Sequence, residues 1–140
     1  MIQRYRSRLS GPLLDRIDLH VEVPRVPHKD LTDVRPAETS ATIRARVNRA
    51  RSIQRERLAP FGLHTNSQMQ ARHIRRFCQL DGRGEALLEQ VTDRLGLSAR
   101  SFTRILKLAR TIADLAGAEQ IDTSHLSEAI QYRGLDRKTV

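Results

Sequence analysis

SARSFTRILKLARTIADLAG, residues 98–117, is the most regular segment of this 140-residue chain. Its apolar residues recur at the three- and four-residue spacing of an amphipathic helix. These apolar positions are Phe102, Ile105, Leu106, Ala109, Ile112 and Ala113. Ser98 can cap the first turn, and Gly117 suits the left-handed conformation that often ends a helix. The segment therefore predicts a helix with one buried face, which needs neighbouring elements to cover it.

The flanking sequences predict helices that can provide this cover. Upstream, a helix that stops at Gly96 has its apolar positions at Leu87, Leu88, Val91 and Leu95. Downstream, Asp122 or Thr123 can cap a last helix whose inward positions are Leu126, Ala129 and Ile130. The last third of the chain, where these helical signals are clearest, is thus predicted to be a set of packed helices.

Two further helices are predicted earlier in the chain. Thr39 or Ser40 can cap one that runs to about Leu58, with an apolar stripe at Ile43, Val47, Ala50 and Ile53. A shorter helix around residues 70–80 has its inward positions at Ile74, Phe77 and Cys78. The composition of residues 81–84, Asp-Gly-Arg-Gly, indicates a turn.

Residues 17–23, Ile-Asp-Leu-His-Val-Glu-Val, alternate between apolar and polar and predict a strand with one buried face. Pro24 and Pro27 end this pattern. No second strand of similar quality follows, and a lone strand is not stable. We therefore expect a mostly α fold, a helical bundle preceded by one orphan strand whose sheet belongs to a part absent from this sequence.

The composition is strongly basic, with a formal net charge of +9 and a pI near 11.1. Arginine supplies 22 of the 25 basic residues, and its planar fork of donors can bind phosphate at two points. A phosphate-bearing partner is one explanation, and a genome that prefers arginine to lysine is the other. Aromatic residues are only 4%, so the core must be mostly aliphatic.

Several classes of protein are not supported by the sequence. One cysteine excludes an internal disulfide framework. No apolar run reaches the ~18 residues of a spanning helix, and the first residues do not form a signal peptide, so we expect a cytoplasmic protein with no membrane partner. The chain has no glycine-rich phosphate loop, and its five histidines are not spaced for a metal site. We expect no metal site, and Cys78 is interpreted as a core residue.

Residues 8–23, RLSGPLLDRIDLHVEV, resemble the segment that follows sensor 1 in AAA+ ATPases of the magnesium chelatase group. There a Leu-Leu-x-Arg-hydrophobic-Asp-Leu motif ends a helix with an arginine finger and enters the last strand of the ATPase core. Residues 95–115, from LGLSARSF to ARTIADL, resemble the helix with the sensor 2 arginine in the helical lid of the same group. The spelling of both motifs is very close to the ComM/YifB branch.

This resemblance implies a division of the chain. Residues 1–23 would end the AAA+ core, 24–36 would be a linker, 37–60 an insert-like helix, 61–134 the lid and 135–140 a tail. The Walker A loop, the Walker B acidic pair and sensor 1 would all precede Met1. The chain is therefore expected to be the C-terminal end of such an ATPase, inactive alone and without a bound cofactor.

The resemblance also assigns roles to arginines. Arg16 would be the arginine finger, acting on the nucleotide of a neighbouring subunit, and an ordinary ion pair with Asp15 or Asp18 is the alternative. Arg100 would be the sensor 2 arginine, with Arg104 as the second candidate one turn further along. A first-turn arginine adds a cation where the helix N-terminus already favours an anion. A solvated charge is the alternative for both.

The implied partners are the chain's own ATPase core and neighbouring subunits of a homo-hexamer, with ATP and Mg²⁺ bound by the intact protein. By resemblance to the ComM branch, the whole protein would be a DNA branch-migration motor in transformation or recombination. The alternative is an ATPase motor subunit of a magnesium chelatase-type complex.

The residues themselves leave two other functions open. One is an arginine-rich, all-α nucleic-acid-binding module that uses Arg44, Arg51 and Arg55, which lie near one another on the 39–58 helix. No aromatic residue is interleaved with them, so stacking on single strands is not supported, and a solvated helix flank is the competing interpretation. The other is a purely structural oligomerisation domain.

Overall fold

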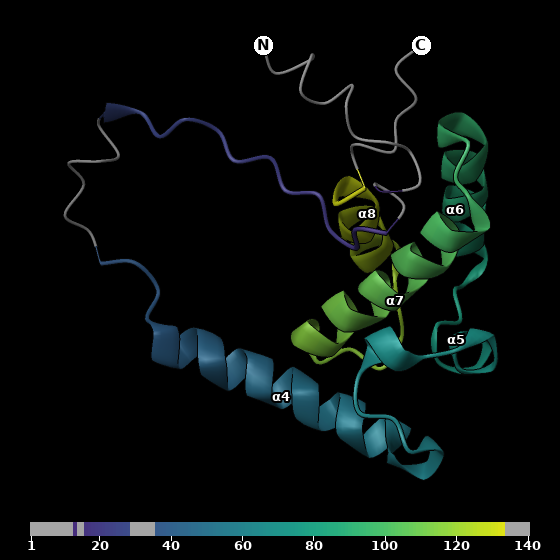
Figure 1. The fold of residues 1–140 in the computed structure, drawn as a ribbon, viewed down its shortest axis with the longest axis horizontal. Helices are drawn as coiled ribbons and strands as arrows, with labels where there is room; N and C mark the ends of the chain where they lie inside the picture. The colour runs from purple at the N-terminus through teal and green to yellow at the C-terminus, as the bar shows by residue number, and fades with distance from the viewer. Residues whose placement is uncertain (1–12, 14–15, 29–35, 134–140) are drawn as a thin grey trace.

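The computed structural model describes residues 13, 16–28 and 36–133 (Figure 1). The helices in this part are α4 (Ser40–Leu58), η1 (Ala59–Phe61), η2 (Asn66–Gln68), α5 (Ala71–Phe77), α6 (Gly82–Leu95), α7 (Ala99–Ala116) and α8 (Thr123–Gln131). The expected mostly α fold is confirmed. Within the described ranges, no helix combines the length and the apolarity that crossing a bilayer requires.

The predicted caps lie where the sequence places them. The Thr39 hydroxyl accepts the amide of Thr42 at 3.2 Å, and the Ser98 hydroxyl accepts that of Ser101 at 3.1 Å. Asp122 caps α8 by accepting the amide of Ser124. Gly117 ends α7 at φ 71°, a left-handed conformation that costs other residues energy. These caps satisfy backbone groups that helix ends otherwise leave unpaired.

Helix α7 forms the centre of the bundle, and α8 packs along it (Figure 1). Ile105 and Ala109 of α7 and Leu126 and Ala129 of α8 are fully buried. The core extends to Leu88 of α6 and to Ile74 and Cys78 at α5. Cys78 is thus the core residue that its sequence position predicts.

The turn predicted at residues 81–84 is wrong, because these residues begin α6. Asp81 is the N-cap, and its Oδ1 accepts the amide of Gly84 at 2.7 Å. A Cβ at Gly84 would lie 3.2 Å from both Asp81 Oδ1 and Leu80 Cβ, so a glycine allows the cap to close tightly. Aspartate and glycine are typical of turns and also of helix starts, and composition alone could not separate the two.

The strand predicted over residues 17–23 is absent, since these residues have no regular secondary structure. A strand exists only when its backbone pairs with another, and no described segment offers a ladder. Instead, the amide of His20 donates to the carbonyl of Tyr132 at 2.7 Å. The predicted tail at 135–140 and most of the predicted 1–23 segment lie outside the described residues.

Helix α4 is only half covered by the bundle. Its C-terminal half packs on α7 through Ala50, Gln54 and Leu58, which are all buried. Its N-terminal half extends beyond the end of α7 (Figure 1), and there Ile43 is 41% and Val47 43% exposed. The apolar stripe predicted for this helix therefore continues past the surface that covers it.

Candidate functional site

Residues 16–20 are attached to α7 and α8 through their backbone. Nη1 of Arg104 donates to the carbonyl of Arg16 at 2.8 Å, and the same guanidinium forms an ion pair with Asp18. Arg133, which is fully buried, donates to the carbonyl of Ile17 and, at 2.9 Å, to the hydroxyl of Ser101. The Arg104 and Arg133 side chains thus tie residues 16–18 to the N-terminal half of α7.

The side chain of Arg16 is exposed. Its guanidinium has no hydrogen bond or ion pair with a residue that the structure describes, whereas its amide donates to the carbonyl of Leu13 at 3.0 Å. The ion pair considered with Asp18 is not formed, and Asp18 pairs with Arg104 instead. Asp15, the other partner considered, lies outside the described residues. Arg16 therefore has an exposed cationic side chain, while its backbone carbonyl is bound by the side chain of Arg104.

The two candidates on α7 have different surroundings. Arg100 is exposed in the first turn, and within the described ranges its guanidinium contacts no acceptor. Arg104 is engaged with Arg16 and Asp18. An anion approaching the start of α7 would thus find Arg100 available, together with the partial positive charge of the helix N-terminus.

The two exposed arginines, Arg16 and Arg100, are chemically suited to binding an anion. Arg16 and Arg100 come from segments joined through Arg104, and each can donate two parallel hydrogen bonds to a phosphate. No nucleophile paired with a base lies beside them among the described residues. The site is suited to stabilising negative charge rather than to carrying out a reaction by itself.

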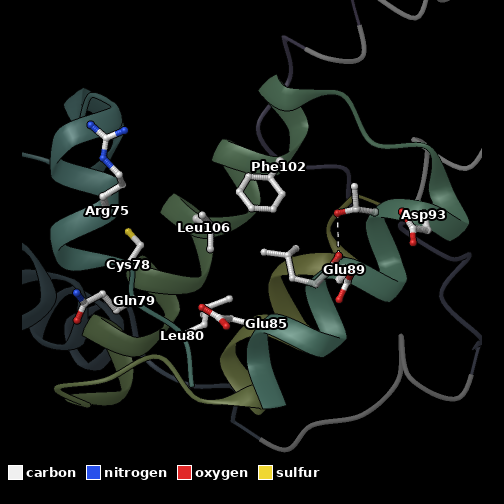
Figure 2. Close-up of a pocket in the computed structure, with 11 residues that line it drawn as sticks. Arg75, Cys78, Gln79, Leu80, Glu85, Glu89, Asp93, Phe102 and Leu106 are labelled. Atoms are coloured by element: carbon white, nitrogen blue, oxygen red, sulfur yellow. Dashed lines mark hydrogen bonds between the residues drawn. The ribbon is translucent and has the colours of Figure 1, made fainter. Parts of the chain in front are cut away.

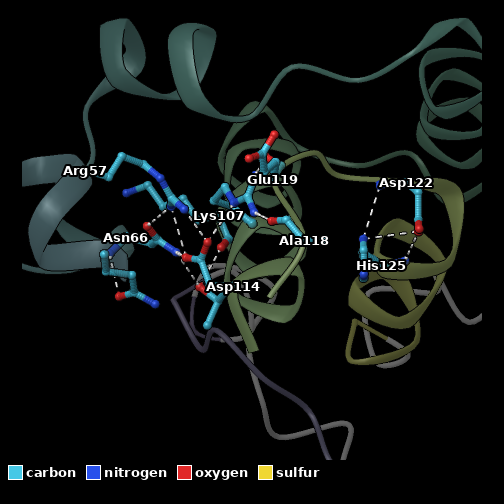
Figure 3. A network of polar contacts seen from close by, with 11 residues as sticks. Arg57, Asn66, Lys107, Asp114, Ala118, Glu119, Asp122 and His125 are labelled. Atoms are coloured by element: carbon cyan, nitrogen blue, oxygen red, sulfur yellow. Dashed lines mark hydrogen bonds and ion pairs between the residues drawn. The ribbon is translucent and has the colours of Figure 1, made fainter. Parts of the chain in front are cut away.

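A buried polar network lies at the other end of α7 (Figure 3). The Asp114 carboxylate accepts from Arg57 of α4 at 3.0 Å, from Asn66 at 2.8 Å and from Arg110 at 3.1 Å. Arg110 also donates to the carbonyls of Ala118 and Glu119 at 2.6 and 2.8 Å. Burial lowers the pKa of Arg110, and the negative charge of Asp114 opposes that shift. The network joins α4 to α7, and sequence reasoning did not predict it.

The buried histidines act as helix caps. Nδ1 of His73 accepts the amide of Gln70 at 3.0 Å, and Nδ1 of His125 accepts that of Asp122 at 3.2 Å. Burial lowers the pKa of His73, with the nearby Arg72 charge adding to the effect. Burial also raises the pKa of Cys78 to about 12, so its thiol is protonated at neutral pH and is a poor nucleophile.

The three arginines considered for nucleic acid are all exposed on α4. Arg55 donates to the hydroxyl of Ser52 at 3.3 Å, while Arg44 and Arg51 have no partner in the described part of the chain. On the opposite flank, Arg46 forms an ion pair with Glu38 at 2.7 Å. Between the two flanks lies the exposed apolar strip of Ile43 and Val47. This helix face is therefore mixed apolar and basic rather than purely cationic.

Known proteins match this chain along nearly its whole length. Residues 37–133 match the family described as Magnesium chelatase, subunit ChlI C-terminal, and residues 1–31 match Magnesium chelatase, subunit ChlI. Competence protein ComM of Haemophilus influenzae is 45% identical over 137 residues, which are 97% of this chain and 26% of that protein. Uncharacterized protein YifB of Escherichia coli is 44% identical over 135 residues, 96% of this chain and 26% of that protein.

A more distant relative, an uncharacterized protein of Mycobacterium bovis, is 33% identical over 131 residues, 94% of this chain and 26% of that protein. The chain thus spans about a quarter of the length of the curated relatives it matches. The helices from α4 to α8 lie within the range that the C-terminal family covers. On these grounds the chain belongs to the magnesium chelatase C-terminal family, as a ComM/YifB-like, magnesium chelatase-like protein.

Proposed function

We propose that this chain is the C-terminal part of a magnesium chelatase-like AAA+ ATPase, in which Arg16 is an arginine finger acting on the ATP of a neighbouring subunit. The observation that carries the proposal is the contrast at Arg16. Its backbone is held by Arg104, and the adjacent Ile17 by Arg133, while its guanidinium is exposed. A finger needs a fixed backbone and a guanidinium that is available to a phosphate, and among the residues that the structure describes nothing pairs with the guanidinium of Arg16.

In this proposal Arg100 is the sensor 2 arginine. Its position in the first turn of α7, without an acceptor among the described residues, favours it over Arg104. Because Arg104 joins the Arg16 segment to α7, the proposal assigns both arginines to one γ-phosphate, that of the neighbouring subunit. ATP, when bound, supplies that phosphate, and its base and Mg²⁺ would be held by residues outside this chain.

The chemical role follows from the charge that develops during phosphoryl transfer. Catalysis of this reaction rests on positioning and on cations directed at the transferred group. Arginine fingers contribute roughly 10³–10⁵ in rate in well-studied NTPases. This chain alone would be inactive, and activity would require its ATPase core and neighbouring subunits, which we propose form a homo-hexamer in the cytoplasm.

For the whole protein we propose a DNA branch-migration motor. The support is the similarity to Competence protein ComM, at 45% identity over nearly the whole chain. The family description, which names a magnesium chelatase subunit, supports a second candidate, the ATPase motor of a chelatase-type complex. Branched DNA should stimulate the ATPase of the first, and chelatase partner subunits that of the second.

The test uses the intact parent assembly, doped with increasing fractions of its Arg16→Ala version. If Arg16 acts between subunits, ATPase activity should fall more steeply than the fraction of variant added, while nucleotide binding stays intact. Arg25→Ala is the matched control, because Arg25 is another exposed arginine of the 16–28 segment. Activity that is indifferent to doping with Arg16→Ala would remove the finger from the proposal.

A further inference from the structure

A groove of about 720 Å³ opens between α5, α6 and α7 (Figure 2). Leu88 of α6 and Phe102 and Leu106 of α7 contribute apolar surface to it, with Leu80 and Cys78 at the end of α5. The pocket adjoins the hydrophobic core but is open at the surface. An apolar groove of this kind suits an apolar side-chain row on a partner.

One wall of the groove is acidic. Glu85, Glu89 and Asp93 lie one helical turn apart along α6, and all three line the groove (Figure 2). Within the described ranges none of them has a hydrogen bond or an ion pair through its carboxylate. The row extends over ~12 Å, at 1.5 Å of rise per residue. Arg75 of α5 is the one cation among the lining residues, against these three carboxylates. The groove therefore combines an apolar interior with a net negative lining.

The N-terminal half of α4 has the complementary pattern. Ile43 and Val47, one turn apart, form its exposed apolar strip. Arg44 lies beside this strip, and Arg51 lies on the same side of α4, two turns or ~10.5 Å further on, at the start of the C-terminal half. Both are exposed, and neither is paired with a described residue. The spacing of these cations is close to that of the acidic row on α6.

We propose that residues 43–51 of α4 from one copy of this chain dock in the α5–α6–α7 groove of a second copy. Ile43 and Val47 enter the apolar interior, and Arg44 and Arg51 face the Glu85, Glu89 and Asp93 row. The same molecule cannot make this contact with itself, because α4 is one continuous helix whose C-terminal half is packed on α7. The occupant is thus a neighbour.

This contact is heterologous, since it uses different surfaces on the two copies. Repeated head to tail, such a contact closes into a ring or continues as a filament. The proposal deepens the assembly proposed above by naming a surface between subunits, and it does not depend on Arg16 or on nucleotide. The acidic wall also makes the groove a poor site for nucleic acid, because phosphates would be repelled.

The experiment is sedimentation velocity of the 140-residue chain at concentrations up to about 1 mM, at low and high salt. We expect concentration-dependent self-association that weakens with salt, as screening of the facing charges requires. Arg44→Glu/Arg51→Glu and Glu85→Arg/Glu89→Arg should each weaken it about tenfold or more, because like charges then face each other. All four positions are exposed, and circular dichroism should show an unchanged fold.

The decisive experiment combines the two pairs of charge-reversing substitutions. A chain that carries both pairs restores opposite charges across the contact and should associate again, as should a mixture of the two single-surface variants. Arg49→Glu and Glu119→Arg are controls at exposed positions outside the α4 strip and the groove. A wild-type chain that stays monomeric, or reversals that are not rescued in combination, would overturn the proposal.

Two further outcomes have defined meanings. If Arg44→Glu/Arg51→Glu removes affinity for a DNA duplex and leaves self-association unchanged, nucleic acid is the partner of α4 and the proposal is wrong. If self-association follows the charge reversals while doping with Arg16→Ala leaves ATPase activity unaffected, the docking surface stands and the arginine-finger role fails. The two proposals can therefore fail separately.

Discussion

Asp114 is the residue on which the join between α4 and α7 depends. Its carboxylate has no exposed surface and accepts from Arg57, Asn66 and Arg110 (Figure 3). Two guanidinium groups thus share one carboxylate in a place with little water. Desolvating these charges is costly, so the pairing stabilises the fold chiefly by preventing the larger penalty of leaving either arginine without its anion.

Asp114→Asn should lower the free energy of unfolding by about 3–5 kcal/mol, because it leaves the buried Arg110 and the partly buried Arg57 without a compensating charge. Urea denaturation followed by circular dichroism measures this. Glu119→Gln, which neutralises an exposed carboxylate three residues beyond α7, is the control and should change little. Equal effects of the two substitutions would mean that the network contributes no more than a surface charge.

His73 makes stability depend on pH. Burial lowers its pKa in the folded state, and the neutral ring accepts the amide of Gln70 at Nδ1. The unfolded chain then binds the proton more readily, so the stabilisation is present above the unfolded pKa of 6.5 and is lost as pH falls below it.

The melting temperature should therefore fall between pH 7.5 and pH 5.5, and His73→Gln should flatten that part of the profile. His64→Gln is the control, because His64 is exposed. A wild-type profile that is flat over this range, or one that His73→Gln leaves unchanged, would contradict the assignment.

At the scale of elements, α4 and α8 show that the same sequence pattern can have two structural outcomes. Leu126 of α8 is fully buried against α7, whereas Ile43 of α4 is 41% exposed. Both lie on apolar faces with helical spacing. Periodicity identifies the face of a helix that can be buried, but how much of that face is covered depends on how far the neighbouring elements extend along it.

Leu126→Ala should cost about 2–5 kcal/mol of stability, as is typical of large-to-small substitutions in a packed core. Ile43→Ala should cost less in dilute solution, because 41% of the Ile43 surface stays exposed after folding, whereas none of the Leu126 surface does. Thermal unfolding at low protein concentration compares the two. A large loss from Ile43→Ala under these conditions would mean that the strip is covered within one chain.

Much of this helical architecture could be predicted from the sequence because its signals are local. The caps at Ser98 and Asp122 and the stops at Gly96 and Gly117 depend on residues within one or two turns. The contacts of Arg104 and Arg133 with residues 16–18 join positions far apart in the chain, and no local pattern reports them. The acidic row on α6 can be read from the sequence. The groove that it lines forms only when α5, α6 and α7 pack together, so the role proposed for the row could not be predicted from the sequence.

At the scale of the whole molecule, α7 connects three features of the structure. Its first turns hold the Arg16 segment, its middle packs on α8, and its last turns bind α4 through Asp114. A change in how an anion contacts Arg100 would thus act on the same helix that anchors both Arg16 and α4. If the proposed nucleotide and subunit contacts are made, α7 is the element through which they can be linked.

Arg100 and Arg104 lie one turn apart on this helix, and replacing each of them by alanine should have different effects. Arg104→Ala removes the donor to the Arg16 carbonyl and the partner of Asp18, so residues 16–20 should detach more often from the bundle. The amide of His20, which donates to Tyr132, should then exchange with solvent several-fold faster. Arg100→Ala removes no contact with a described residue and should leave that exchange rate unchanged.

The proposed function predicts that both variants lower the ATPase activity of the intact assembly, and amide exchange distinguishes the two causes. Arg100→Ala should reduce turnover and weaken nucleotide binding with His20 still protected, as expected for a residue that contacts the nucleotide. Arg104→Ala should reduce turnover together with that protection, as expected for a residue that positions Arg16. If Arg100→Ala also releases His20, its effect on activity would be structural. If Arg104→Ala leaves both exchange and turnover unchanged, the Arg16 backbone is not held in the way that the finger proposal requires.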